Sequence, residues 1–585
     1  MPLLLAAGCA GTSSTLNQPL EIEIGAQGVT RLADAYVNEF INRFPEEAFS
    51  AGFTLPNDSG LSDNSLAALS AWERKQDAWL SELQRIDGEA LWGRPEWITY
   101  GLLREALEAQ RGARVCRFEL WPLNQISGWQ AKFATLATSQ PVGTLQRRAD
   151  AIARWRQLPR YLETEIANLK EGIRLGYTTP KRNVDLTLQQ IDQLLALSPG
   201  DSPFFEPARR DAEPEFVQAW TALLEDEIQP AIRRYRDFVR KEYLLAARTV
   251  LAVIALPRGS ECYRASFRLQ TTIERRPEDT HALGKRVVER NEGEIRAIGE
   301  RGFGNADVTT LRTRIENDPS NRFTNAEDIR AHAAAATQRA REALPNWFGR
   351  LPKLGYSIEP IPDFLAASAS PHYEPAARDG SRPGVYFIKL YEPEKQLYSR
   401  NELTAFHEGY PGHHMQIALS QELPGVHSIS QLISFGSYVE GWGRYAEALA
   451  EEMGLYQSPY AAMGRRFWPA RGMVVDTGLH VLGWTREQAV QYITAGGSPV
   501  GPEALVDRLV VWPAQLTAYD TGAIEIFALR DQARRELGAL FDLREFHDRV
   551  LAHGAITLPM LRRVIEHWIA EKKGKLHWLP KVRPW

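Results

Sequence analysis

Cysteine is nearly absent from this sequence of 585 residues, which contains only Cys9, Cys116 and Cys262. None of the three belongs to a Cys-x-x-Cys pair or stands in a group with histidines. Zinc sites made of thiolates and thioredoxin-like redox sites need such groupings, so the sequence argues against both classes. Cys116 and Cys262 are candidates either for one disulfide in an oxidising compartment or for two buried thiols, and both alternatives stay open.

The sequence also lacks long apolar runs and an excess of positive charge. No stretch reaches the roughly 18 to 20 apolar residues that a membrane-spanning helix needs. The formal net charge is −4, so we expect no nucleic-acid partner. With 44% hydrophobic and 24% charged residues, the composition is that of a globular protein that can bury a large core.

Residues 1–20 differ in texture from the rest of the chain. "MPLLLAAGCAGTSSTLNQ" is a short apolar run followed by small residues, a cysteine and a Ser/Thr/Gly linker. This order resembles the end of a bacterial lipoprotein signal, in which Cys9 becomes lipidated. No basic segment precedes the run and Ala6 stands where leucine is commonest, so a frayed apolar tail is the alternative. We expect an exported, periplasmic protein that contacts the membrane only through a lipid on Cys9.

Helical periodicity dominates the remaining sequence, which predicts a mainly α fold. Apolar residues recur three and four positions apart in segments 28–44, 142–173, 215–248, 278–302 and 326–348. By contrast, "GVYFIKLY" (384–391) has the β-branched and aromatic residues of a strand and lies in a segment rich in proline, glycine and serine. We therefore expect a helical region over 21–348 and a second region over 349–585, with a small sheet near 355–392 and further helices.

The segment "NELTAFHEGYPGHHMQ" (401–416) holds three of the chain's twelve histidines. His407 followed by Glu408 is typical of zinc peptidases, whose HExxH motif places a second histidine four residues after the first. Here Pro411 occupies that place. Because proline cannot donate a backbone N–H, the helix must kink or bulge there.

A bulge over 409–412, made easy by its two glycines, would carry the next histidine to the position of the second ligand. We favour His413 for this role, and His414 is the alternative. The helix itself is expected to start with a capping box in which Ser399 pairs with Glu402.

A catalytic zinc site needs a third protein ligand, and a downstream segment offers one. Residues 428–454 predict a single helix that starts with a capping box at Ser428 and Gln431 and ends at Gly454. Glu440 and Glu447 lie two turns apart on it and so share one face. We predict Glu440 as the third ligand and Glu447 as the residue that orients a ligand histidine; a solvated or ion-paired Glu447 is the alternative.

Three glycines, Gly436, Gly441 and Gly443, fall inside this predicted helix. Each costs roughly 1 kcal/mol relative to alanine in a helix. The close approach of another element at that point would explain them.

The motifs "HEGYPGHHMQ", "YVEGWGRYAE", "VVDTGLH" and "PAQLTAYDTG" resemble those of a widespread family of bacterial exported proteins of unknown function. That family is grouped with the gluzincin zinc metallopeptidases, whose ligands are two histidines and a later glutamate. The resemblance covers most of the chain after about residue 25. It implies a helical gluzincin-like fold with a small β-sheet next to the active-site helix and a deep cleft.

These observations predict a zinc-dependent hydrolase that cleaves amide bonds of small or unstructured peptides. One Zn²⁺ would be held by His407, His413 and Glu440, and Glu408 would act as the general base. From their family position and chemistry, Tyr519 and His480 are candidate donors to the oxyanion that forms, with Asp476 one turn before His480. Tyr519 as a packing residue and His480 as a core histidine are the alternatives.

Three further expectations concern function. "GVYFIKLY" would lie along the cleft and pair with an extended peptide backbone. Hydrolysis of a non-peptide amide is an alternative within the enzyme class. An exported metal-binding lipoprotein without catalysis, acting as a binding or scaffold module, is the alternative outside it, and the presence of a base at Glu408 argues against it.

Overall fold

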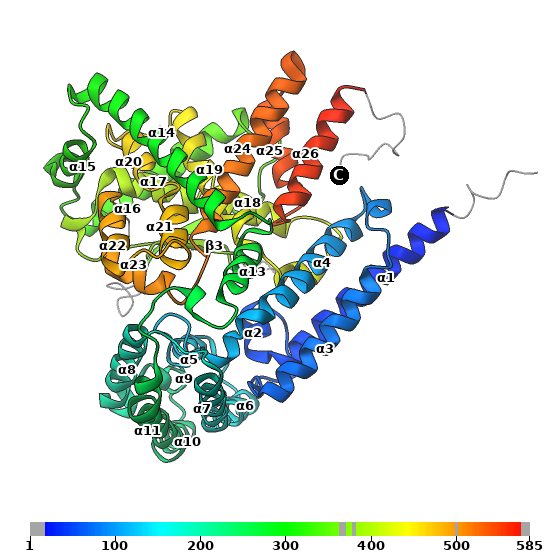
Figure 1. Ribbon diagram of the computed structural model, residues 1–585, viewed down its shortest axis with the longest axis vertical. Coiled ribbons are helices and arrows are strands. Elements are labelled where there is room, and N and C mark those ends of the chain that lie inside the picture. The colour runs from blue at the N-terminus through cyan, green and yellow to red at the C-terminus, as the bar shows by residue number, and fades with distance from the viewer. Residues whose placement is uncertain (1–17, 362–369, 377–381, 498–500, 575–585) are drawn as a thin grey trace, which may run out of the picture.

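The computed structural model describes residues 18–361, 370–376, 382–497 and 501–574, which form a mainly helical protein with one small sheet (Figure 1). The lipid attachment expected at Cys9 lies outside the described residues. Of the described helices, none combines the length and the apolar character needed to cross a membrane.

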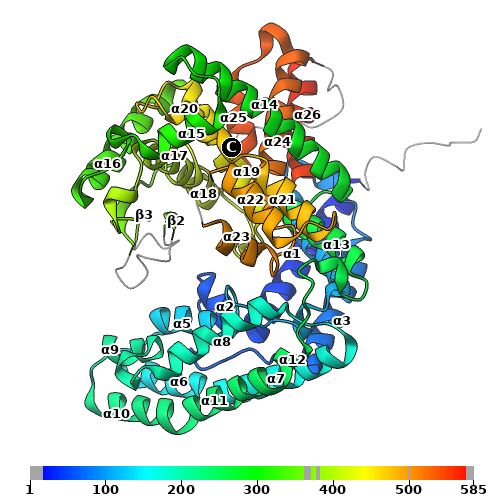
Figure 2. The same ribbon diagram turned by 60° about the vertical axis from the view of Figure 1, so that its left-hand side comes forward.

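The N-terminal helices divide into two groups. Three long helices lie side by side (Figure 1), accompanied by one short helix: α1 (Gln18–Arg43), α2 (Pro45–Ser50), α3 (Leu66–Leu83) and α4 (Pro95–Ala113). The second group forms a separate layer with its own hydrophobic core (Figure 2): α5 (Trp129–Ser139), α6 (Leu145–Trp155), α7 (Leu158–Leu175), α8 (Lys181–Ala196), α9 (Glu206–Arg210), α10 (Pro214–Ala222), α11 (Gln229–Phe238) and α12 (Leu244–Ala246).

The remaining helices build the body that carries the sheet. Before the sheet come α13 (Gly259–Thr271), α14 (Pro277–Phe303), α15 (Val308–Asn317) and α16 (Ala326–Ala343). After the sheet come α17 (Tyr398–Glu408), α18 (His413–Gln421), α19 (Gly436–Glu452), α20 (Ala461–Phe467), α21 (Arg471–His480), α22 (Arg486–Ala495), α23 (Pro502–Leu509), α24 (Thr517–Leu537), α25 (Leu543–Leu551) and α26 (Leu558–Lys572).

The five segments with helical periodicity are helical in the structure, which confirms the mainly α prediction. Segment 142–173 is divided between α6 and α7 rather than continuous. The division falls where Pro159 stands in the first turn of α7, a position that tolerates proline because its missing N–H has no helical partner there.

The predicted small sheet is present, but its strand order corrects one expectation. The strands are β1 (Tyr356–Pro360), β2 (His372–Glu374) and β3 (Gly384–Ile388), in the order β1-β3-β2. β3 pairs with β1 in parallel and with β2 in antiparallel orientation. The expectation that "GVYFIKLY" pairs with a peptide backbone is therefore wrong, because both edges of β3 are already used.

The largest hydrophobic core draws on helices from both ends of the chain. It contains residues between Ala26 and Leu107 and residues between Phe323 and Ile569. The expected division at 348–349 thus does not separate two cores. The first group of N-terminal helices, which includes α1, α3 and α4, packs onto the same core as the helices that follow the sheet.

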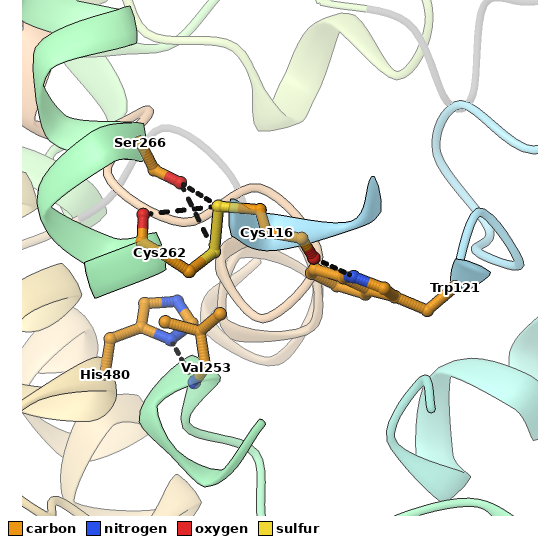
Figure 3. The surroundings of a disulfide bond; sticks show 6 residues. All are labelled: Cys116, Trp121, Val253, Cys262, Ser266 and His480. Atoms are coloured by element: carbon orange, nitrogen blue, oxygen red, sulfur yellow. Dashed lines mark hydrogen bonds between the residues drawn. A yellow bond between two sulfur atoms is a disulfide. The ribbon is translucent and has the colours of Figure 1, made fainter. Parts of the chain in front are cut away.

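Cys116 and Cys262 form a disulfide, the first of the two alternatives that the sequence left open (Figure 3). It links the segment directly after α4 to α13, across 146 positions of sequence. Trp121 donates a hydrogen bond from its indole Nε1 to the carbonyl oxygen of Cys116, at 3.0 Å.

The helix expected over 428–454 is shorter than predicted. A short 3₁₀ helix (Ser428–Gln431) comes first, and α19 begins only at Gly436. Its C-terminal end agrees with the prediction, since Gly454 has a φ of +70°, which glycine adopts without strain.

A glycine of α19 and a glycine of α24 face each other at the point where the two helices cross. Gly441 of α19 lies against Gly522 of α24, and a Cβ on Gly441 would lie 2.6 Å from the Cα of Gly522. A Cβ on Gly522 would lie 1.7 Å from the carbonyl oxygen of Ser437. The two backbones therefore approach too closely for any side chain at this point, which confirms the predicted reason for Gly441. The reason fails for Gly436, where the nearest atom to a Cβ would be the Cβ of Ala518 at 3.9 Å, an ordinary contact.

We predict that Gly522→Ala lowers the free energy of unfolding by about 1–3 kcal/mol or more, because the methyl group forces α19 and α24 apart. The measurement is urea denaturation followed by circular dichroism. Gly293→Ala is the matched control, since a Cβ at that helical position meets nothing within 4 Å. Its stability should stay unchanged or rise by up to about 1 kcal/mol. Equal effects of the two substitutions would contradict the packing argument.

Candidate metal centre

A sharp turn between α17 and α18 brings the motif histidines together. The sequence predicted a bulge within one helix, but the structure has two helices, one ending at Glu408 and the other starting at His413. A Cβ on Gly412 would lie 1.9 Å from the carbonyl oxygen of His407, so only glycine fits there. Trp442 of α19 donates its indole N–H to the carbonyl oxygen of Pro411 at 2.9 Å and so ties the turn to the next helix.

The capping box expected at the start of α17 is wrong. The helix begins at Tyr398, one residue before Ser399. Glu402 is fully buried instead, where it accepts hydrogen bonds from Arg339 and from the backbone N–H of Gln457. Its carboxylate therefore anchors the helix to neighbouring elements.

His407, His413 and Glu440 converge on one point. The Nε2 atom of His407 lies 3.4 Å from Oε2 of Glu440, and Nε2 of His413 lies 3.6 Å from the same oxygen. The candidate ligand atoms of His407, His413 and Glu408 all lie within 4.8 Å of one another. Three residues from α17, α18 and α19 thus present two imidazole nitrogens and a carboxylate oxygen to a common space.

The electrostatics of the group favour a cation. Burial alone would raise the pKa of Glu440, but the nearby imidazoles of His407 and His413 hold it well below its usual range. Burial alone would lower the pKa of His407, but the neighbouring carboxylates of Glu440 and Glu447 raise it to about 10. The carboxylate of Glu440 is therefore held in its ionised form, which attracts a cation.

Glu447 holds His407 from the side away from Glu440. Its Oε1 accepts a hydrogen bond from Nδ1 of His407 at 2.8 Å. Arg444 donates to both oxygens of Glu447, at 2.8 and 3.1 Å. Glu447 is buried, so this hydrogen bond fixes the tautomer and the orientation of the imidazole and leaves Nε2 free for a metal.

Gly443 is the third glycine of α19, and it makes room for a ligand. A Cβ at this position would lie 2.6 Å from Cε1 of the His407 ring. The imidazole therefore lies directly against the backbone of α19.

Glu408 lies beside His407 and His413, with a carboxylate oxygen within 4.8 Å of a ring nitrogen of each. Burial raises the pKa of Glu408, while the charges of His413 and His407 lower it in part. A buried glutamate whose pKa is raised is suited to accept and return a proton near neutral pH.

His414, the alternative to His413 as second ligand, has both ring nitrogens against tyrosine hydroxyls rather than towards Glu440. Its Nε2 lies 3.1 Å from the hydroxyl of Tyr410 and its Nδ1 lies 2.9 Å from the hydroxyl of Tyr373. Both nitrogens are thus engaged on the side of β2, and burial lowers the pKa of His414 to about 4. His413 is the histidine that faces Glu440.

Tyr519, at the start of α24, lies next to the candidate centre. Arg444 lies over its ring, with the guanidinium carbon 5.7 Å from the ring centroid. Burial and the charge of Glu440 raise the pKa of Tyr519, so its hydroxyl keeps its proton and can donate a hydrogen bond.

His480 is not brought to the metal ligands. It is fully buried beside the disulfide (Figure 3), where Nδ1 accepts a hydrogen bond from the backbone N–H of Val253 at 3.0 Å and Nε2 donates to the carbonyl oxygen of Leu509 at 2.9 Å. Both nitrogens are occupied, so the structure gives His480 the core role that was the alternative in the sequence.

Asp476 lies in the same buried region. Its Oδ1 accepts hydrogen bonds from the hydroxyl of Tyr263 at 2.6 Å and from the backbone N–H of Ala514 at 3.0 Å. Its Oδ2 is buried without a partner. Burial raises the pKa of Asp476 to about 7.

Sequence reasoning missed Arg444, although a signal was present. Arg444 stands three residues before Glu447 in "YVEGWGRYAE", and residues three apart share a helix face. The spacing alone could have predicted that this arginine neutralises the carboxylate behind His407.

Comparison with known proteins gives one family and two similar folds. The model of the family described as "Bacterial protein of unknown function (DUF885)" matches residues 45–565. A lipoprotein candidate from Colwellia psychrerythraea has a similar structure, with a TM-score of 0.84 and 22% sequence identity over 95% of this chain and 99% of that chain. A lipoprotein candidate of unknown function from Shewanella oneidensis gives a TM-score of 0.74 and 20% identity over 92% of this chain and 99% of that one. No match was found among curated proteins.

We predict that Glu447→Gln weakens zinc binding by about 10–100-fold, because the amide no longer supplies the charge that orients His407 and makes it more basic. Competition with a chromogenic chelator measures the affinity. Glu451→Gln is the control, since Glu451 is one turn further along α19 and pairs with Arg465 and Arg466 instead. Equal affinities of the Glu447→Gln variant and the unmodified protein would contradict the role given to Glu447.

We also predict a pH dependence of stability that originates at Asp476. Because its folded-state pKa of about 7 lies above its ordinary value of 3.8, the folded state holds this proton more tightly. The contribution is fully present below about pH 4 and is lost as pH rises towards 7, by up to about 1.4 kcal/mol per pH unit. Asp476→Asn cannot ionise, so its stability relative to the unmodified protein should rise between pH 4.5 and 8. Parallel curves of unfolding free energy against pH would contradict this.

Proposed function

Because the chain belongs to DUF885, a family of bacterial proteins of unknown function, we propose its activity from the site itself: a zinc-dependent hydrolase that cleaves amide bonds of small or unstructured peptides. The observation that carries the proposal is the approach of two imidazole Nε2 atoms to one carboxylate oxygen, at 3.4 and 3.6 Å.

These distances support a metal site better than a set of hydrogen bonds. Charge-assisted N–H···O bonds are usually about 2.7–2.9 Å long. Two ligand atoms that share a tetrahedral zinc ion are roughly 3.4 Å apart, given metal–ligand distances of about 2.0–2.2 Å. Two histidines and a glutamate are also a donor set typical of catalytic zinc. The residues present therefore fit the ion, with His407, His413 and Glu440 as its ligands.

When bound, zinc supplies a Lewis acid that polarises a carbonyl group and makes water more acidic. The carboxylate of Glu408 accepts the proton of the attacking water and returns it to the leaving amide nitrogen. The hydroxyl of Tyr519 donates a hydrogen bond to the oxygen of the substrate carbonyl, where negative charge develops. Glu447 and Arg444 keep His407 oriented through this sequence.

The burial of the ligands supports a restriction to extended substrates. The side chains of His407, His413 and Glu440 are 13%, 10% and 25% exposed. An extended peptide segment brings its backbone to such a position more readily than the surface of a folded protein does. The gluzincin-type fold and the deep cleft that the sequence predicts stay predictions.

The proposal includes export to the periplasm and anchoring by a lipid on Cys9. It is supported by the order of residues around Cys9, by the disulfide between Cys116 and Cys262, and by the description of two similar structures as lipoprotein candidates. Disulfides persist in oxidising compartments, to which exported proteins belong.

We predict that Glu408→Gln lowers peptide cleavage by about 10²–10⁴-fold while zinc stays bound, because the substitution removes the base but no ligand. Metal content is measured by elemental analysis of protein purified without chelator. Cleavage is measured by mass spectrometry on a mixed peptide library, with and without chelator. Glu394→Gln, at an exposed position before α17, is the control and should keep full activity.

Full activity in the Glu408→Gln variant would rule out this mechanism. Stoichiometric zinc in the unmodified protein, with no cleavage of any peptide in the library, would favour the non-catalytic binding lipoprotein instead.

A further inference from the structure

Arg508 of α23 is held by a neutral amide and an aromatic ring. Its Nη2 donates a hydrogen bond to the side-chain oxygen of Gln515 at 2.8 Å, and its guanidinium carbon lies 5.4 Å from the ring centroid of Trp512. Its Nε is buried without a hydrogen-bond partner. Within the described parts of the chain, no carboxylate forms an ion pair with Arg508 at 4.0 Å or less. A neutral amide and an aromatic ring thus hold the guanidinium in place without neutralising its charge.

Neighbouring arginines are paired in the usual way. Arg182 and Arg486 both form ion pairs with Asp507, the residue before Arg508. Arg444 is engaged by Glu447. Arg508 therefore differs from these three arginines, because no carboxylate of the described residues pairs with it.

This charge lies close to the candidate metal centre. Gln515, which holds Arg508, stands four residues before Tyr519 in the sequence. Tyr519 in turn lies under Arg444, which contacts the glutamate behind the ligand His407. A series of neighbouring side chains thus leads from Arg508 through Gln515, Tyr519 and Arg444 towards His407.

We propose that Arg508 binds the C-terminal carboxylate of the peptide substrate, so that the protein releases short pieces from peptide C-termini. This inference rests on the proposed hydrolase function and adds the direction in which the substrate lies. A planar guanidinium offers two parallel N–H groups that match the two oxygens of a carboxylate. Every unmodified peptide has such a group at its C-terminus, whereas an acidic side chain is present in only some.

The reaction is an ordinary hydrolysis and needs no further reactant. Water adds its hydroxyl to the carbonyl carbon and its proton to the leaving nitrogen as the C–N bond breaks. The released amine is the fragment that carries the carboxylate held by Arg508. Binding that fragment near Tyr519 places a peptide bond close to the substrate's C-terminus beside His407, His413 and Glu440.

The first test is binding, which does not depend on turnover. Glu408→Gln protein is incubated with N-acetylated pentapeptides of randomised sequence in three forms, and bound peptides are identified by size exclusion and mass spectrometry. The forms are free acids, C-terminal amides, and C-terminal amides with glutamate as the last residue. Free acids should be retained about 10–100-fold better than plain amides, as expected for one charged contact.

Arg508→Gln, introduced into the Glu408→Gln protein, should abolish the preference for free acids. Arg508→Lys in the same protein should keep part of the preference, because lysine keeps the charge but not the planar guanidinium. Arg182→Gln is the matched control, since it removes a nearby arginine that already has a carboxylate partner, and it should keep the preference. Equal retention of acids and amides, or no retention of either, would overturn the inference. Retention of the glutamate-bearing amides as strongly as the free acids would overturn the C-terminal assignment in favour of an acidic side chain.

The second test separates this inference from the proposed function. Chelator-sensitive cleavage of free acids and amides at equal rates would leave the hydrolase in place and refute the role of Arg508. Retention of free acids that depends on Arg508, without cleavage of any peptide, would refute hydrolysis and support the carboxylate site.

Discussion

The candidate centre depends on backbones that approach α19 too closely for side chains. On one face, Gly441 lies against Gly522 of α24. On another, Gly443 lies against the imidazole of His407, and Trp442 binds the carbonyl oxygen of Pro411. One helix thus positions the turn that carries the histidines, supplies Glu440 and Glu447 itself, and holds α24 with Tyr519 at its start. The cost of several glycines in a helix is offset by the packing that they permit.

Each of the two carboxylates of α19 at the candidate centre faces a histidine or an arginine. Glu440 faces the two imidazoles, Glu447 lies behind His407, and Arg444 balances Glu447. Buried carboxylates are unfavourable unless paired, so the arginine stabilises the glutamate that orients the ligand. Arg508 is different, because no carboxylate pairs with it in the described parts of the chain, where Gln515 and Trp512 hold it. A charge left without a partner near a candidate catalytic site is better explained by a ligand than by the stability of the fold.

Much of the helical framework could be predicted from sequence, because the periodicity of apolar residues is a local property. The five periodic segments and the strand at "GVYFIKLY" are present in the structure. Helix starts were less predictable: the capping boxes at Ser399 and Ser428 failed because Glu402 is used by Arg339 and by the backbone of Gln457, and because α19 starts only at Gly436. A side chain that finds a partner far along the chain is no longer available as a local cap.

The sequence by itself determined the residue types of the candidate centre, their order along the chain, and the need for a break at Pro411, since these follow from chemistry and local backbone geometry. Tertiary structure alone decided that His413 faces Glu440 while His414 faces two tyrosines, and that both nitrogens of His480 are used in the core. It also decided that β3 is a central strand and that Arg508 has no acidic partner among the described residues. Each of these depends on which distant segments meet, and no local pattern encodes that.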